Sequence, residues 1–288
     1  MVLAVGNTLW TACMVATGRN ERAFPYMTGV ALCSHHMIDR THAIGLAKNG
    51  AAIASMWFLY SVVRSTTAGA EQVARNNAEL VLAWQQSVGL AIEPALQRWL
   101  LTDIVGVFAN VYYLLHFPVT VALLIATCLW SRKHIFPILR DSLLVMTGVG
   151  LVLHLFFPLA PPRMLDGIID ASTMYGPNPY SVPGSEAANQ FAAMPSMHVA
   201  WAIALGWTLF RISTRRSLWI IAMAHPLVTL FVVLVTGHHF LIDVVVGSLV
   251  GILAISLVSS VHQRTTNLDT PAQRVADTSD PFHTLSTG

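Results

Sequence analysis

The chain has 288 residues, of which 55% are hydrophobic and only 10% are charged. A soluble domain carries about 25% charged residues, so this composition excludes a water-soluble globular protein and indicates one embedded in a lipid bilayer. The formal net charge of +2 is too small to indicate nucleic-acid binding. The three cysteines, Cys13, Cys33 and Cys128, lie in apolar stretches and lack the spacing of a metal site or a disulfide framework.

Six apolar segments approach or exceed the roughly 20 residues that cross the hydrocarbon core. They are 44–64, 103–130, 141–159, 198–213, 217–235 and 240–261. The sequence therefore predicts an all-α, polytopic membrane bundle of six core transmembrane helices over residues 44–261. Residues 1–43 precede the bundle, and their apolar stretch 1–17 is either a seventh span or a partly buried segment, because it lacks the basic leader of a signal peptide.

The composition of the segments outside the predicted spans also predicts their structure. Residues 71–101 repeat apolar residues at helical spacing, with Trp84 and Trp99 among them, which predicts an interfacial helix on the outer surface of the membrane. Residues 160–197 are rich in Pro, Gly, Ser and Asn and are predicted to form an outer loop. The polar tail 262–288 is predicted to be disordered in the cytoplasm.

Basic residues orient this bundle. The short loop 131–140 and the turn 211–216 each contain three of them, and the positive-inside rule places both in the cytoplasm. The loop 160–197 has a single basic residue, Arg163, and so falls on the extracytoplasmic face of the cell membrane.

Three polar motifs interrupt the apolar pattern at that outer face: Pro161-Pro162-Arg163, Pro195-Ser196-Met197-His198, and Thr236-Gly237-His238-His239, which continues to Asp243. The fourth span runs inward from His198 and the fifth returns to His238 and His239. At about 1.5 Å per helical residue, the two spans bring the chain back to the depth of His198. Residues some 40 positions apart are therefore predicted to be neighbours.

These motifs hold the groups that phosphoryl transfer needs. His239 and Asp243 are four residues apart, so the carboxylate can accept the imidazole N–H on one helical face, which leaves the other ring nitrogen free as a nucleophile. His198 can protonate the leaving oxygen, and the guanidinium of Arg163 matches phosphate oxygens. Ser196, at a helix N-terminus, is a further candidate for phosphate binding, as is His238. No metal or other cofactor is required.

Other roles remain open for these side chains. A metal site of His198, His239 and Asp243 is one alternative, although no fuller ligand set is present. Two roles are open for His116 and Asn110 in the second span: each makes either packing hydrogen bonds or contacts to the substrate.

At these motifs the sequence resembles the type 2 phosphatidic acid phosphatase superfamily, over about residues 75–260, and within it the branch of inositol phosphorylceramide synthases and bacterial relatives. Pro195-Ser196-Met197-His198 resembles the Pro-Ser-Gly-His motif, and His239-x3-Asp243 resembles the end of the Ser-Arg-x5-His-x3-Asp motif. The resemblance implies a six-helix bundle, a phospho-histidine intermediate on His239, and His198 as the acid for the leaving group.

The sequence also departs from the family pattern. The Ser-Arg pair would fall at Val232 and Val233, and no lysine lies seven residues before Arg163. Arg163 is therefore expected to carry a larger share of the charge neutralisation, with help from His154. The departures are similar to the synthase branch, in which an alcohol such as inositol replaces water as the acceptor.

Together these observations predict a membrane lipid phosphatase or phosphotransferase that acts on a lipid phosphate or phospholipid at the extracytoplasmic face. The alternative is a non-catalytic lipid transporter or flippase. A transporter of that kind has internal repeats and polar residues near mid-membrane, whereas here the polar motifs gather at one face, which favours the enzyme. The sequence leaves open the lipid, the head group, the acceptor and the oligomeric state.

Overall fold

The computed structural model describes residues 70–130, 135–176 and 190–268, together with Asn178 and isolated positions between 49 and 62. The chain forms two compact units, 1–52 and 53–288, and every element named here belongs to the second. The predicted N-terminal segment 1–43, most of the first predicted span and the end of the tail lie outside the described residues.

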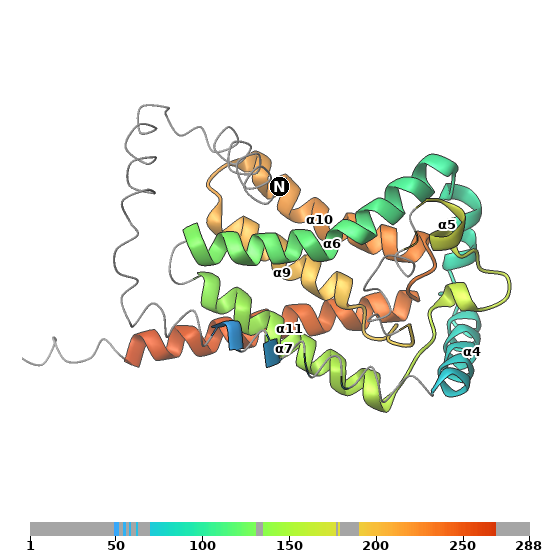
Figure 1. Cartoon of the computed structure of the whole chain (residues 1–288), viewed down its shortest axis with the longest axis horizontal. Coiled ribbons are helices and arrows are strands. Elements are labelled where there is room, and N and C mark those ends of the chain that lie inside the picture. The colour runs from blue at the N-terminus through green and yellow to red at the C-terminus, as the bar shows by residue number, and fades with distance from the viewer. Residues whose placement is uncertain are drawn as a thin grey trace, which may run out of the picture. The chain divides into compact units, whose positions relative to one another are not determined.

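The described residues are helical and contain no β-strand, which confirms the all-α prediction. The helices are α4 (Glu71–Ser87), α5 (Glu93–Leu100), α6 (Asp103–Trp130), α7 (Ile135–Phe156), the 3-10 turn η2 (Pro162–Met164), α8 (Ala171–Met174), α9 (Met197–Ile212), α10 (Arg216–Val235) and α11 (Leu241–Leu268) (Figure 1). A parallel bridge between Leu159 and Ala192 joins the start of the connection between α7 and α9 to its end.

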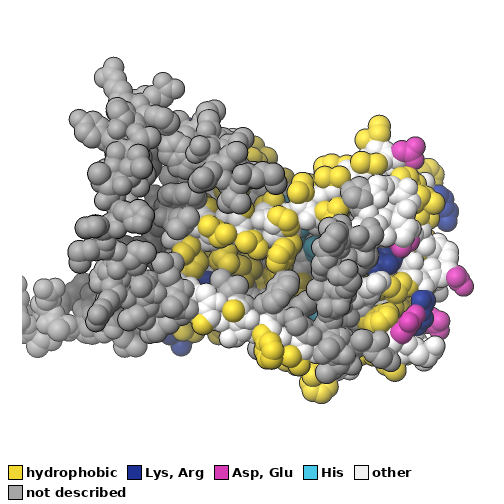
Figure 2. All heavy atoms as spheres, in the orientation of Figure 1, with side chains coloured by type: hydrophobic (Ala, Val, Ile, Leu, Met, Phe, Trp, Pro, Cys, Tyr) yellow, Lys and Arg dark blue, Asp and Glu magenta, His cyan; other side chains and the backbone are white. Residues whose placement is uncertain are grey.

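Four of these helices are long and apolar enough to cross a membrane: α6, α7, α10 and α11. The 16-residue α9 is equally apolar but shorter. These helices support a multi-pass membrane protein, while the count of six core spans stays a prediction because the segment 44–64 is mostly outside the described residues. Hydrophobic side chains cover the visible flank of the described helices, as a lipid environment requires (Figure 2).

The third span begins earlier than the sequence predicted. We expected residues 131–140 to be a loop, whereas α7 starts at Ile135 and includes Arg140. The helix accepts this charge because the Arg140 side chain donates to Asp141 at 2.6 Å and lies over the Phe136 ring, 5.8 Å from its centre. A basic residue was therefore mistaken for a helix boundary.

The segment predicted as one interfacial helix over 71–101 is two helices, α4 and α5, separated by the turn 88–92. Its polar side chains Gln85, Glu93 and Gln97 are almost completely buried, whereas Trp84 and Trp99 are 48% and 78% exposed. These three polar side chains therefore face the bundle, and the two tryptophans face outward. Figure 2 shows charged side chains gathered at the end of the described helices where α4 and α5 lie.

The centre of the bundle is formed by α7, α9 and α11, which share one hydrophobic cluster: Leu139, Met146, Ala200, Ala204, Ala254 and Ile255. Small residues let α9 and α11 approach closely, because Gly247 and Gly251 face the backbones of Ser196 and Ala200. This approach brings the start of α9 against the start of α11, where two of the sequence motifs lie.

Candidate active site

The two histidine motifs converge at one end of the bundle, which we call the histidine end. Helix α9 begins at Met197, α10 ends at Val235, and residues 236–240 lead into α11. The rings of His198 and His239 lie edge to face with their centroids 5.9 Å apart. The convergence predicted from helix lengths is therefore present.

The turn after α10 is fixed by its own backbone. Gly237 adopts a positive φ of 74°, while the His238 N–H donates to the Val233 carbonyl at 3.1 Å and the Gly237 N–H to Leu234 at 3.1 Å. This is a Schellman cap, which ends a helix with a left-handed residue. A Cβ on Gly237 would also lie 3.2 Å from the Cβ of Arg163, so both the backbone conformation and the available space favour glycine. The cap directs the two following histidines into the bundle.

His239 is held by a backbone carbonyl. Its Nδ1 lies 2.8 Å from the Ala193 oxygen, whereas the nearest Asp243 oxygen is 3.6 Å away. The sequence predicted that Asp243 would accept this proton, but the carbonyl takes the closer position. Because a carbonyl only accepts, Nδ1 carries the hydrogen and Nε2 carries the lone pair. Burial, with a smaller effect from the Arg163 charge, lowers the pKa of His239 to about 4, so the ring is neutral at physiological pH.

Asp243 is completely buried, in the first turn of α11. One carboxylate oxygen accepts the Phe240 N–H at 2.8 Å, as an acidic residue in the first turn of a helix often does. Within the described part of the chain, its other oxygen has no hydrogen-bond partner. The carboxylate thus lies beside the His239 ring and faces its N–H edge without replacing the carbonyl.

Arg163 supplies the cation. Its backbone N–H donates to the Gly237 carbonyl at 2.8 Å. Its guanidinium nitrogens lie 3.5 Å from a carboxylate oxygen of Asp170 and 3.5 Å from the side-chain oxygen of Gln190. Burial, followed by the positive charge of Arg163, holds the pKa of His238 well below its usual range. Arg163 is therefore close enough to the histidine turn to act on it electrostatically.

Ser196 and His154 complete the predicted set. The Ser196 N–H donates to the Asp243 carbonyl at 3.0 Å, which ties the start of α9 to α11. Its hydroxyl is buried and has no partner within the described segments. The His154 ring, near the end of α7, hydrogen-bonds to the Pro195 carbonyl. All seven residues predicted for the site thus lie at the histidine end.

Comparison with known proteins agrees with this arrangement. The PAP2 superfamily matches residues 79–257. The chain belongs to the PAP2 superfamily. A relative from Bacteroides thetaiotaomicron, named phosphoinositol dihydroceramide synthase, is 26% identical over 201 residues, and the match covers 59% of this chain and 61% of the relative. No solved structure matches the chain. The PAP2 match includes every predicted site residue and confirms the resemblance seen in the motifs.

Tyr113 is a member of this PAP2 site that the sequence analysis missed. Its ring stacks between His198 and His238, with centroid distances of 4.2 Å and 4.1 Å. Tyr113 lies on α6, three residues before His116, so the two share a helical face. That spacing in an otherwise apolar span was the available signal.

A buried polar clamp, formed by Gln85 and Glu93, was also missed. One Glu93 oxygen accepts the Leu241 N–H at 2.6 Å and the Gln85 amide at 2.9 Å, and the Gln85 oxygen accepts the Ile242 N–H at 3.0 Å. With Asp243 on Phe240, these contacts satisfy the first N–H groups of α11, which have no partner within the helix. The helices α4 and α5 therefore fix the helix that bears Asp243.

Two other polar residues of the spans have packing roles. The Asn110 amide donates to the carbonyls of Ala171 at 2.7 Å and Tyr175 at 3.1 Å, which supports a packing role, whereas its side-chain oxygen has no partner among the described residues. The Nδ1 atom of His225 forms a hydrogen bond with the Tyr112 hydroxyl at 2.8 Å.

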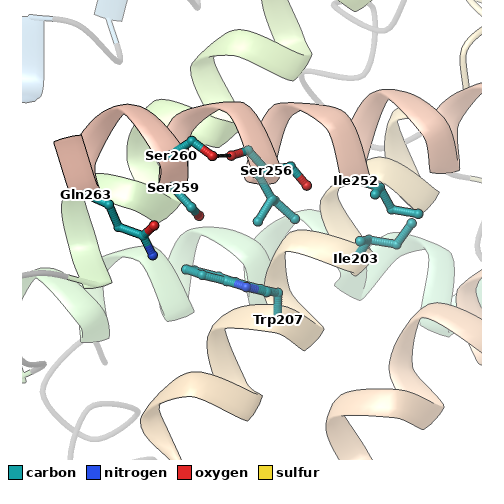
Figure 3. A pocket seen from close by; sticks show the side chains of 8 residues that line it. Ile203, Trp207, Ile252, Ser256, Ser259, Ser260 and Gln263 are labelled. Atoms are coloured by element: carbon teal, nitrogen blue, oxygen red, sulfur yellow. Dashed lines mark hydrogen bonds between the residues drawn. The ribbon is translucent and has the colours of Figure 1, made fainter.

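A groove of about 420 Å³ lies between α9 and α11, toward their other ends, and its lining includes Ile203, Trp207, Ser256, Ser259 and Gln263 (Figure 3). The Ser260 hydroxyl beside it donates to the Ser256 carbonyl at 2.8 Å. The groove has no histidine or carboxylate in its lining and is separate from the histidine end. In the described segments, no three His, Cys, Asp or Glu side chains are placed to hold a metal ion, so the metal-site alternative gains no support.

Proposed function

We propose that this protein transfers a phosphate group from a membrane lipid phosphate or phospholipid through a phospho-histidine on His239. Membership of the PAP2 superfamily supports a membrane lipid phosphatase or phosphotransferase. The observation that carries the mechanism is the contact between His239 Nδ1 and the Ala193 carbonyl, because it leaves Nε2 as a neutral nucleophile.

In the first half of the reaction, Nε2 of His239 attacks phosphorus and the bond from phosphorus to the lipid oxygen breaks. His198 gives a proton to that departing oxygen; the negative phosphate nearby favours the protonated form of the ring that this step needs. The His239 ring becomes cationic as it bonds to phosphorus. Asp243, 3.6 Å from Nδ1, stabilises that charge more than it stabilises the neutral ring, so its contribution grows toward the transition state.

In the second half, an acceptor hydroxyl attacks phosphorus, the bond from phosphorus to Nε2 breaks, and the acceptor proton passes to His198. Arg163 binds phosphate oxygens in both halves, since a guanidinium pairs with two of them at once. The Ser196 hydroxyl and the N-terminus of α9 add hydrogen-bond donors. Water and an alcohol are the alternative acceptors, and the name of the Bacteroides relative supports the alcohol.

The experiment that tests this mechanism follows the phosphoprotein itself. The purified chain in detergent is mixed with phosphatidate labelled on phosphorus, quenched at alkaline pH, and assayed for bound label. His239→Ala should carry no label and His198→Ala should be slow to acquire it, because general acids contribute about 10²–10⁴-fold. His262→Gln is the matched control, since His262 pairs with Asp141 far along α11 and should label normally. Label on His239→Ala would assign the nucleophile to another residue.

The extracytoplasmic position of the site is proposed from the charge distribution. A single cysteine replacing the exposed Asp166, near Arg163, should react with a membrane-impermeant thiol reagent in intact cells, in a background without the native cysteines. A cysteine replacing the exposed Thr214, in the basic turn between α9 and α10, should react only after the cells are opened. The opposite pattern would place the histidine end in the cytoplasm.

A further inference from the structure

A second group of polar side chains lies about one helical turn beyond His198. His116 follows Tyr113 by three residues on α6, and its ring centroid is 5.2 Å from that of His198. On its other side it stacks on His225 of α10, at 5.6 Å and with the planes 13° apart. His225 is in turn held by the Tyr112 hydroxyl, which also contacts Thr229 at 2.7 Å.

His116 differs from the rest of this group because its side chain is unsatisfied. The residue is only 3% exposed, and neither ring nitrogen has a hydrogen-bond partner among the described residues. A neutral imidazole has one donor and one acceptor, and burying both without partners is unfavourable. By contrast, His225 has one nitrogen bound. The hydrogen-bonding capacity of His116 is therefore unused within the described residues.

The surroundings indicate what kind of molecule this is. The Tyr113 ring separates the two sides of the site, since it stacks on His198 with one face and on His238 with the other. Arg163 lies on the His238 side, where its charge acts, and His116 lies on the His198 side. A neutral imidazole next to the group that exchanges protons suits an uncharged hydroxyl, which can donate to one ring and accept from the other.

We infer that His116 binds the acceptor hydroxyl, of water or of an alcohol, beside His198. The inference rests on the proposed function and extends it to the second half-reaction. There the acceptor oxygen bonds to phosphorus, the bond from phosphorus to Nε2 of His239 breaks, and the proton moves from the acceptor to His198. His116 orients the hydroxyl and itself neither gives nor takes a proton, so it is needed most in the second half-reaction, where no bond to phosphorus yet holds the acceptor oxygen in place.

The test separates the two half-reactions. The full chain is labelled with phosphatidate carrying labelled phosphate, excess unlabelled substrate is added, and the loss of label from the protein is followed. His116→Phe should lose label about tenfold more slowly, the effect expected of one hydrogen bond to a reacting group. It should slow labelling less, because the leaving oxygen occupies the same position but is already held there by its bond to phosphorus. His116→Gln, which keeps a donor and an acceptor, should recover part of the rate of label loss. Thr120→Val is the matched control, since among the described residues the Thr120 hydroxyl donates to the His116 backbone carbonyl, at 2.8 Å, and does not contact the His116 ring nitrogens.

The acceptor is identified by running the chase in buffer alone, with myo-inositol, and with a dihydroceramide. Slower release of inorganic phosphate in His116→Phe identifies water as the bound hydroxyl, and slower formation of one phosphate ester identifies that alcohol. If His116→Phe slowed labelling and release of label by the same factor, the inference would be overturned, because the residue would then have a structural role. Unchanged release would overturn it as well. A wild-type chain that never carries label would refute the proposed function, and this inference with it.

Discussion

Gly247→Ala adds a single methyl group but should strongly reduce the rate of catalysis. A Cβ at this position would lie 3.0 Å from both the backbone N and the backbone C of Ser196, and in closer contact still with its carbonyl oxygen. Ordinary contacts of this kind are about 3.5–4.0 Å, so relief needs a shift on the order of 0.5–1 Å. The atoms in the way are backbone, and no side-chain rotation can provide the room. The shift must therefore separate α9 from α11.

The separation acts directly on the proposed chemistry. Ser196 precedes His198 by two residues and bonds to Asp243 through its N–H, so moving it changes the position of His198 relative to His239. A misplacement of about 1 Å can reduce an enzymatic rate about 10²-fold, while overpacking lowers the free energy of unfolding by about 1–3 kcal/mol. We expect kcat on labelled phosphatidate to fall by about that factor in a variant that remains folded.

Two matched variants identify the cause. Gly148→Ala makes the same change in α7 where a Cβ would meet nothing within 4 Å; it should leave activity unchanged and raise the free energy of unfolding by up to about 1 kcal/mol, because alanine is the better helix former. Gly251→Ala meets the Ala200 backbone at 3.0 Å, one turn deeper, and should lower the thermal midpoint with a smaller loss of rate. Full activity in Gly247→Ala, measured beside the phosphoprotein assay, would refute the requirement for close contact between the two helices.

Three further predictions follow from the buried polar groups. Because the pKa of His239 is lowered to about 4, phosphoprotein formation should hold steady as the pH falls from 7 to 5 and decline only near pH 4. The unfolded ring takes up its proton near pH 6.5. The free energy of unfolding should therefore decrease as the pH falls from 6.5 to 4. A decline centred near pH 6.5 would contradict the burial of His239. Glu93→Ala should lower the free energy of unfolding by about 1–3 kcal/mol for each of its two orphaned donors, one of which is the Leu241 N–H, whereas Glu93→Gln should lose less; equal thermal midpoints would refute the clamp. Asp243→Asn should keep the bond to the Phe240 N–H and the fold but slow labelling, whereas Asp243→Ala should lose both, and a fully active Asp243→Asn would remove the carboxylate from the mechanism.

The sequence alone predicted the helical membrane architecture and the meeting of the histidine motifs. Both depend on quantities that can be counted along the sequence, namely the length of apolar runs and the rise per helical residue. Because α9 and α10 are apolar and joined by a short basic turn, the return of the chain from His198 to His239 followed from counting residues. The PAP2 match over residues 79–257 confirms the family to which those motifs belong.

The contacts that finish the site were not predictable in this way. The proton of His239 is held by the Ala193 carbonyl, and every residue has such a carbonyl, so no letter in the sequence marks it. The polar residues of α4 and α5 repeat at helical spacing, but the pattern does not say which face turns inward. In the structure Gln85 and Glu93 turn inward and accept the first N–H groups of α11, which have no partner within the helix.

The contacts of Gln85 and Glu93 with the start of α11 link the outer helices α4 and α5 to the candidate site. A helix that begins within an apolar bundle cannot leave its first N–H groups to water, so α11 depends on acceptors from elsewhere in the chain. Asp243 is one of them, through Phe240, and the others come from helices whose opposite faces expose Trp84 and Trp99, as residues at a membrane interface do. The Leu241 and Ile242 N–H groups at the start of α11 therefore depend on Glu93 and Gln85 from these two helices. The carboxylate beside His239 is thus held in position by the same contacts that stabilise the start of α11, so the groups that stabilise the fold also position the proposed nucleophile.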